Sequence, residues 1–252
     1  MGVAEALPIL AAGVAAGAIN TLVGSGTLIT FPVLLALGYP PVVANASNTV
    51  GLVPGSVAGA WSYRAELATQ RDLLLRLGFT SLLGGITGAV LLLVLPAEAF
   101  RTIVPVLIGI ALVLVVLQPW LARSLRKRQD LPAGGSRSGL LLTLGIFATS
   151  VYGGYFGAAQ GVLLLGILGL LVPATLQQLN GVKNVFAGLV NAVAAVIFIV
   201  AGTVSWPPVL LIAAGSITGS LIAGRYGRRL PDPALRAVIV VVGVIAVVRM
   251  LI

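Results

Sequence analysis

Cysteine and histidine are both absent from the 252-residue sequence. Their absence excludes disulfides, thiolate nucleophiles, and zinc or iron sites built on thiolate or imidazole ligands. Acidic residues are scarce as well, since there are six, all in expected loops or at the ends of apolar stretches. An intramembrane serine protease would need a base and an aspartyl enzyme would need paired carboxylates, so neither class fits. We therefore expect no catalytic residue, no metal site and no cofactor.

Charged residues form 8% of the chain and hydrophobic residues 59%, whereas soluble domains carry about 25% charged residues. Apolar runs long enough to cross a bilayer recur along the whole sequence. The 32 glycines agree with this interpretation, because small residues let membrane helices approach closely. The sequence therefore predicts an all-α, polytopic protein of the cell membrane that crosses the lipid bilayer several times.

Basic residues outnumber acidic ones by 15 to 6, which gives a formal net charge of +9. Such a charge can attract nucleic acid, but the basic residues form no continuous binding face. Twelve of them gather in three loops between apolar runs, at 64–76, 123–137 and 225–236. Basic loops of membrane proteins stay in the cytoplasm, so the basic residues indicate which loops face the cytoplasm. No nucleic-acid partner is expected.

Two motifs occur twice in the chain. The stretch LPAEAFR at 95–101 returns as LPDPALR at 230–236, and GGITGAV at 84–90 returns as GSITGSL at 215–221. Twofold internal repetition is typical of secondary transporters.

Each half contains five apolar elements in the same order. They are expected at about 3–23, 26–38, 42–63, 74–94 and 99–119, and then at about 140–158, 160–172, 178–201, 206–224 and 234–252. The second element of each half has about 13 residues, which as a helix is roughly 20 Å long, less than the roughly 30 Å hydrocarbon core of a bilayer. It either folds back beside the long element before it or continues that element as one broken helix.

The basic loops favour the folded-back pair, whether re-entrant or fully spanning. In that arrangement all three basic loops face the cytoplasm, each half has an odd number of crossings, and both chain ends lie outside the cytoplasm. We therefore predict two inverted-topology repeats, each a long-short helix pair followed by three transmembrane helices. The first repeat covers 1–119, a basic cytoplasmic linker covers 120–138, and the second repeat covers 139–252.

Polar side chains inside the expected spans are few, and they are the candidates for binding a transported substrate. Lys183 is charged and lies within a span. Asn180, Asn184 and Asn191 in the same span fall on nearly one helix face, and Asn45 and Asn48 lie in the matching stretch of the first half. The ammonium would neutralise an anion while the amides donate hydrogen bonds to it. Alternatively, Lys183 extends to the membrane surface and the amides hold helices together.

The junctions inside the long-short pairs are a second candidate for substrate contact. Gly24, Ser25 and Gly26 precede one short element, and Gln160 and Gly161 begin the other. A helix that starts at a glycine-rich break points its N–H groups and the positive end of its dipole at the space beside it. Two such helix N-termini facing one space would favour the binding of an anion there.

The stretches at 23–50, 152–171 and 179–198, followed by Trp206, resemble in order and spacing the TauE/SafE sulfite exporter family, also called the toluenesulfonate uptake permease family. The resemblance extends over essentially the whole chain. It implies a permease that carries small sulfur-containing anions, such as sulfite or organosulfonates, across the bacterial inner membrane.

A secondary transporter is thus the expected function, with an anion channel as the alternative and an intramembrane enzyme least favoured. Two inverted halves favour alternating access, and hence a carrier over a channel. No Asp, Glu or His lies within a span to carry a coupling proton. Coupling to sodium, held by backbone carbonyls and Asn oxygens, and uncoupled export down the membrane potential both stay open. The expected partners are a small anionic substrate and the lipid bilayer, and assembly into a homo-oligomer is left open.

Overall fold

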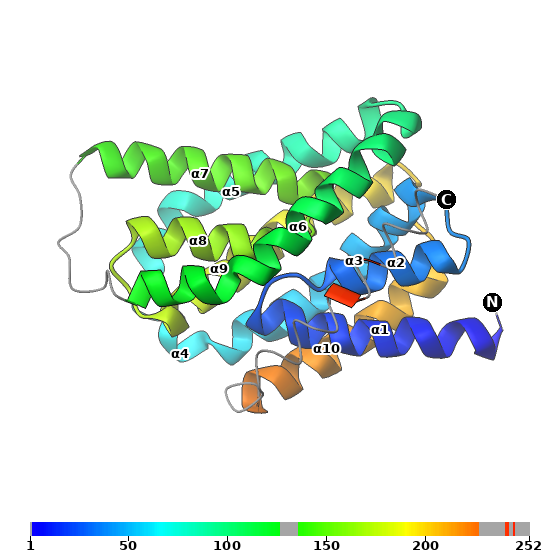
Figure 1. The fold of residues 1–252 in the computed structure, drawn as a ribbon, viewed down its shortest axis with the longest axis horizontal. Coiled ribbons are helices and arrows are strands. Elements are labelled where there is room, and N and C mark those ends of the chain that lie inside the picture. Colours follow the sequence, from blue (N-terminus) through cyan, green and yellow to red (C-terminus); the bar gives the residue numbers. More distant parts are fainter. Residues whose placement is uncertain (1, 127–135, 227–239, 242–243, 245–252) are drawn as a thin grey trace.

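The computed structural model describes residues 2–126, 136–226, 240–241 and 244 (Figure 1). This part of the chain is helical and contains no strand, which confirms the all-α prediction. Its helices are α1 (Val3–Leu22), α2 (Thr27–Ala36), α3 (Pro41–Ser62), α4 (Arg64–Leu67), α5 (Arg71–Val94), α6 (Ala97–Arg126), α7 (Ser136–Tyr155), α8 (Gln160–Leu171), α9 (Leu176–Val200) and α10 (Trp206–Tyr226).

The expected apolar elements up to residue 224 all coincide with helices. Helix α4 is an additional single turn inside a basic loop, and α6 runs beyond its expected end to Arg126. Helices α6 and α7 therefore extend into both ends of the expected linker. Three predicted segments lie outside the described residues. They are the middle of that linker at 127–135, the second copy of the repeated motif at 230–236, and most of the last expected element at 234–252.

Local sequence explains where several helices begin and end. Helix α3 starts with Pro41, whose fixed φ suits the first helical position. Helix α9 starts with a capping box, in which the Thr175 hydroxyl accepts from the Gln178 N–H and the Gln178 side chain accepts from the Thr175 N–H. After α1 the chain reverses at Gly24, whose φ of 91° is readily adopted only by glycine.

Five of the described helices, α1, α5, α6, α9 and α10, are long and apolar enough to cross a membrane. Helices α2 and α8 are short, with 10 and 12 residues, as the lengths of the apolar runs predicted. Helix α3 has 22 residues, but Asn45, Ser47 and Asn48 lower its hydropathy. Helix α3, which carries candidate site residues, is therefore long enough to cross a membrane but is not among the five helices that are also apolar enough.

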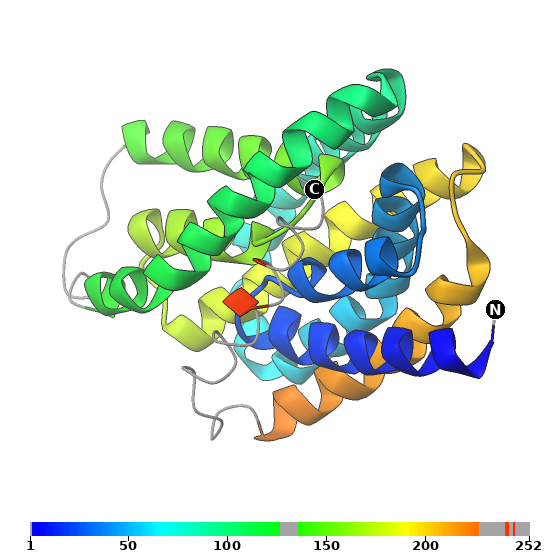
Figure 2. The same cartoon turned by 45° about the vertical axis from the view of Figure 1, so that its right-hand side comes forward.

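Helices of the two expected halves pack against one another in matching pairs. Helix α1 lies along α10 and helix α7 lies along α5, while α3 packs against α10 and α9 packs against α5 (Figure 2). Helices α3 and α9 also pack against each other. Glycines allow the close pairs, since Gly17 lies against the backbone of Ser216 and Gly88 lies against the carbonyl of Val151.

Helix α2 folds back beside α1 instead of continuing it. The start of α1 and the α2–α3 turn therefore lie at one end of the molecule, whereas α4 lies at the other end (Figure 1). The α8–α9 connection lies at the same end as α4, because the Gln178 side-chain amide donates to the Thr69 hydroxyl at 2.9 Å.

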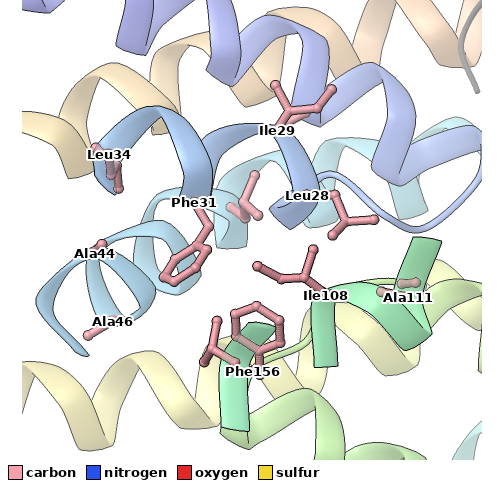
Figure 3. Packing of buried hydrophobic residues seen from close by; sticks show 14 of the residues in the cluster. Leu28, Ile29, Phe31, Leu34, Ala44, Ala46, Ile108, Ala111 and Phe156 are labelled. Atoms are coloured by element: carbon pink, nitrogen blue, oxygen red, sulfur yellow. The ribbon is translucent and has the colours of Figure 1, made fainter. Parts of the chain in front are cut away.

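Aromatic side chains fill the space between α2, the start of α6 and the break after α7. The Phe31 and Phe156 rings meet edge to face with centroids 5.2 Å apart (Figure 3). Phe100 lies against both rings. Such edge-to-face pairs add about 0.5–1.5 kcal/mol to the gain from burial. This cluster fixes α2 and the break after α7 relative to each other.

Candidate substrate cavity at the two helix breaks

The breaks between α1 and α2 and between α7 and α8 have the same local geometry. After α1 the N–H groups of Val23 and Gly24 both donate to the Ile19 carbonyl, and after α7 those of Phe156 and Gly157 both donate to the Tyr152 carbonyl. Gly24 and Gly157 both have positive φ, at 91° and 76°. This glycine-terminated turn leaves the last carbonyls of each helix without backbone donors in the described part of the chain.

The two breaks touch each other through glycine backbones. The Gly161 N–H donates to the Gly24 carbonyl at 3.0 Å. A Cβ atom on either residue would overlap the Cα atom of the other. Glycine is therefore required on both sides of this crossing.

Lys183, from α9, caps the end of α1. Its side chain is fully buried, with 0% exposed. Its Nζ donates to the carbonyls of Asn20 and Thr21, each at 3.1 Å, and the Asn184 amide donates to the Thr21 carbonyl at 3.3 Å. These carbonyls form the negative end of the α1 dipole, which stabilises an ammonium. The Lys183 side chain is thus held inside the protein, between α9 and the end of α1, and is not exposed at the protein surface.

Asn45, from α3, caps the other broken helix. Its amide donates to the Tyr155 carbonyl, the last of α7, at 3.0 Å. Each half of the chain therefore supplies the residue that caps the broken helix of the other half. One of these caps is a neutral amide and the other is a cation.

A small cavity of about 20 Å³ lies where these groups meet. Six of the eleven expected site residues line it: Gly24, Gln160, Gly161, Lys183, Asn184 and Asn191. Other lining residues were not predicted, namely Asn20, Thr21, Thr27, Ser56, Gly157 and Ala187. Two of these residues could have been predicted from the sequence. Asn20 is an amide in the last helical turn before the first break, and Gly157 occupies the place of Gly24 in the other half.

The other five expected residues, Ser25, Gly26, Asn45, Asn48 and Asn180, do not line the cavity. Asn48 accepts a hydrogen bond from the Thr30 hydroxyl and donates one to the Thr27 hydroxyl, which ties α3 to α2. The Gly26 N–H donates to the Asn20 side-chain oxygen at 2.8 Å. Ser25 and Asn180 are buried, and the Ser25 hydroxyl and the Asn180 side-chain oxygen have no hydrogen-bond partner in the described part of the chain.

The start of α8 offers fewer free backbone N–H groups to a substrate than the sequence predicted. At α8 the N–H groups of Gln160, Gly161 and Val162 all donate to backbone carbonyls of the breaks. The Gln160 side-chain Nε2, by contrast, is buried and has no partner among the described residues. Lys183 has a third N–H beyond the two that reach carbonyls. Lys183 is also the one charged residue among the buried side chains of the described ranges, so the cavity is electropositive.

No group of three or more His, Cys, Asp or Glu residues that could hold a metal ion occurs in the described ranges. Every residue that lines the cavity is uncharged except Lys183. The arrangement can therefore donate hydrogen bonds and offer one positive charge, and its described lining contains no carboxylate.

Comparison with known proteins gives a family match and several relatives that each cover most of the chain. A family described as "Sulfite exporter TauE/SafE" matches residues 9–250. The chain is 27% identical over 250 residues to the "Probable membrane transporter protein YfcA" of Escherichia coli (strain K12), covering 94% of this chain and 86% of that protein. It is 25% identical over 238 residues to the "Probable membrane transporter protein ORF9" of Sinorhizobium sp, covering 94% and 88%. A "Probable membrane transporter protein" of Haemophilus influenzae is 24% identical over 241 residues, with 94% and 91% covered.

Proposed function

The chain belongs to the TauE/SafE sulfite exporter family, and from this premise we propose that it is a secondary transporter of small sulfur-containing anions such as sulfite or organosulfonates. The family resemblance of the sequence is thereby confirmed, as is the prediction of a multi-pass membrane protein. The relatives named above are described as membrane transporters, and none of those descriptions states a cargo.

The observation that carries the proposal is the buried Lys183 ammonium in a cavity whose described lining has no carboxylate. A cation and a monoanion about 4 Å apart attract by about 4 kcal/mol at an effective dielectric near 20, before desolvation is subtracted. The Gln160 amide, buried with a free N–H donor in the described part of the chain, suits an oxyanion. Both groups favour a small anion over a neutral or cationic cargo.

Alternating access is supported by the matching helix pairs. The α1–α10 pair and the α7–α5 pair, and the reciprocal caps Lys183 and Asn45, suit two inverted repeats that rock against each other about the site. A cavity of about 20 Å³ has room for roughly one water molecule. An anion of several atoms would need the Gly24–Gly161 contact to open, so this contact is the proposed moving part.

The test is flux into proteoliposomes that contain the purified protein. We expect saturable uptake of sulfite and methanesulfonate, and faster uptake of labelled anion when the same unlabelled anion is present inside. That acceleration is typical of a carrier, whereas a channel gives none. Absence of flux for every sulfur-containing anion tried, with correctly inserted protein, would refute the proposed cargo.

A further inference from the structure

The end of α1 has the form of a cation site. Two carbonyls, those of Asn20 and Thr21, converge on one point 3.1 Å from each, and that point is occupied by Lys183 Nζ. Ends of broken helices and their carbonyls are the groups with which many secondary transporters bind a coupling sodium ion. The hydroxyl of Thr27 and the side chain of Asn20 lie on the same cavity, and both carry oxygen atoms that could complete such a site.

The second break serves as an internal control. The matching helix end after α7 is capped by Asn45 through one neutral amide at 3.0 Å. Capping a broken helix in this fold therefore does not require a charge. Burial of an ammonium is costly, so the charge at the first break needs a reason other than capping.

We propose that the Lys183 ammonium is a built-in cation that occupies the α1 carbonyl site in place of a coupling sodium ion, and that anion transport by this chain is consequently independent of sodium. This inference rests on the proposed function. The ammonium is tethered to α9 and reaches across to α1. The group that fills the carbonyl site is therefore part of the chain in every transport cycle and does not diffuse away, whereas a bound sodium ion would.

The surroundings of Lys183 are consistent with this role. The described residues that share its cavity come from α1, α2, α3, α8, α9 and the two breaks, and none of them is titratable. No carboxylate in that set competes with the carbonyls for the ammonium. The Lys183 stem also lies against Gly161, since a Cβ there would be 3.1 Å from Lys183 Cδ, so a shorter side chain at 183 would leave space beside the carbonyls.

The experiment compares sodium with the bulky cation N-methyl-D-glucamine. Labelled sulfite is exchanged against unlabelled sulfite across proteoliposomes, because this exchange moves no net charge. The native chain should exchange equally fast in both cations. Lys183→Ala should be slower by about tenfold or more in N-methyl-D-glucamine, the factor that corresponds to about 1.4 kcal/mol, and sodium should restore much of that loss. Lys183→Met is the matched control, because its side chain fills the space, and sodium should not restore its exchange.

A second measurement does not depend on transport. The unfolding temperature of detergent-solubilised Lys183→Ala should rise with sodium concentration, since a ligand that binds the folded state stabilises it. The native chain and Lys183→Met should show no such rise.

Native exchange that requires sodium would overturn the inference and leave the proposed function intact. The inference is also overturned if Lys183→Ala folds but its exchange and its unfolding temperature both ignore sodium. If the native chain exchanges no anion at all, the proposed function fails, and the unfolding temperatures then decide alone whether position 183 lies at a cation site.

Discussion

At the scale of single residues, Asn184 separates hydrogen bonding from charge. Its amide donates to the Thr21 carbonyl at 3.3 Å beside the Lys183 ammonium. Asn184→Ala removes one neutral hydrogen bond, worth about 1 kcal/mol, and leaves the charge in place. We expect a loss of anion affinity of about fivefold at most, measured as the half-saturating sulfite concentration in proteoliposomes. If Asn184→Ala weakened anion affinity as much as removal of the Lys183 side chain does, the charge would not be the main source of that affinity, and the proposal would be contradicted.

The glycine crossing gives a second residue-scale prediction. Gly161→Ala would make a Cβ atom overlap the Gly24 Cα atom, and such overpacking costs about 1–3 kcal/mol. We expect a lower unfolding temperature, followed through the three tryptophans. Gly109→Ala, where a Cβ meets nothing within 4 Å, is the control and should be neutral or stabilising, because alanine favours the helix. Equal effects of the two substitutions would show that the crossing is not tight.

Sequence patterns predicted residues that line the cavity, Lys183 among them, but not the direction of each amide. Lys183, Asn184 and Asn191 line the cavity, whereas Asn48 bonds threonines of α2. An asparagine in a membrane helix has the same sequence signature in both cases. Which way it faces depends on the packing of α3 against α2, and this information is absent from the local sequence.

At the scale of helices, two close pairs hold the halves together. Gly88 of α5 lies against the Val151 carbonyl of α7, and Gly219 of α10 lies against the Val14 carbonyl of α1. Gly88→Val and Gly219→Val should each force a pair apart and lower the unfolding temperature. Gly78→Ala, on the same helix as Gly88, would place its Cβ atom 3.8 Å from Leu189 Cδ1, which is ordinary packing distance, and should have little effect. A Gly88→Val protein as stable as the native one would disprove tight α5–α7 packing.

Helix lengths followed well from the sequence, because the ends of apolar runs coincide with glycine, proline and capping residues such as Gly24, Pro41 and Thr175. The end of α6 did not. An apolar run predicts where a helix leaves the membrane, but the helix itself continues into the basic segment up to Arg126, since arginine is a good helix former.

At the scale of the whole molecule, the proposed inverted repeats predict which loops share a side of the membrane. The chain has no cysteine, so single cysteines can be introduced one at a time and labelled. A cysteine at position 68 should react from the cytoplasmic side together with cysteines at 130 and 230, which lie outside the described residues. A cysteine at Gly38 or Gly202 should react from the opposite side. Labelling of position 230 from the side opposite to position 68 would refute the inverted arrangement.

The whole-molecule topology stays a prediction from charge, in which three basic loops constrain the number of crossings. The contact between the two breaks could not be predicted in the same way. It joins Gly24 and Gly161, which are 137 positions apart in sequence. Their meeting depends on the α1–α10 and α5–α7 pairs, which bring the halves together.

The central claim is that the charge of Lys183 binds the anion. Its most direct test is the half-saturating concentration for sulfite exchange by Lys183→Met, compared with Asn45→Leu. Both variants lose a cap on a broken helix, but only the first loses a charge. We predict that Lys183→Met weakens anion affinity by about tenfold or more, the effect of about 1.4 kcal/mol of lost attraction, and that Asn45→Leu leaves affinity nearly unchanged. Unchanged affinity in a folded, inserted Lys183→Met protein would contradict the claim.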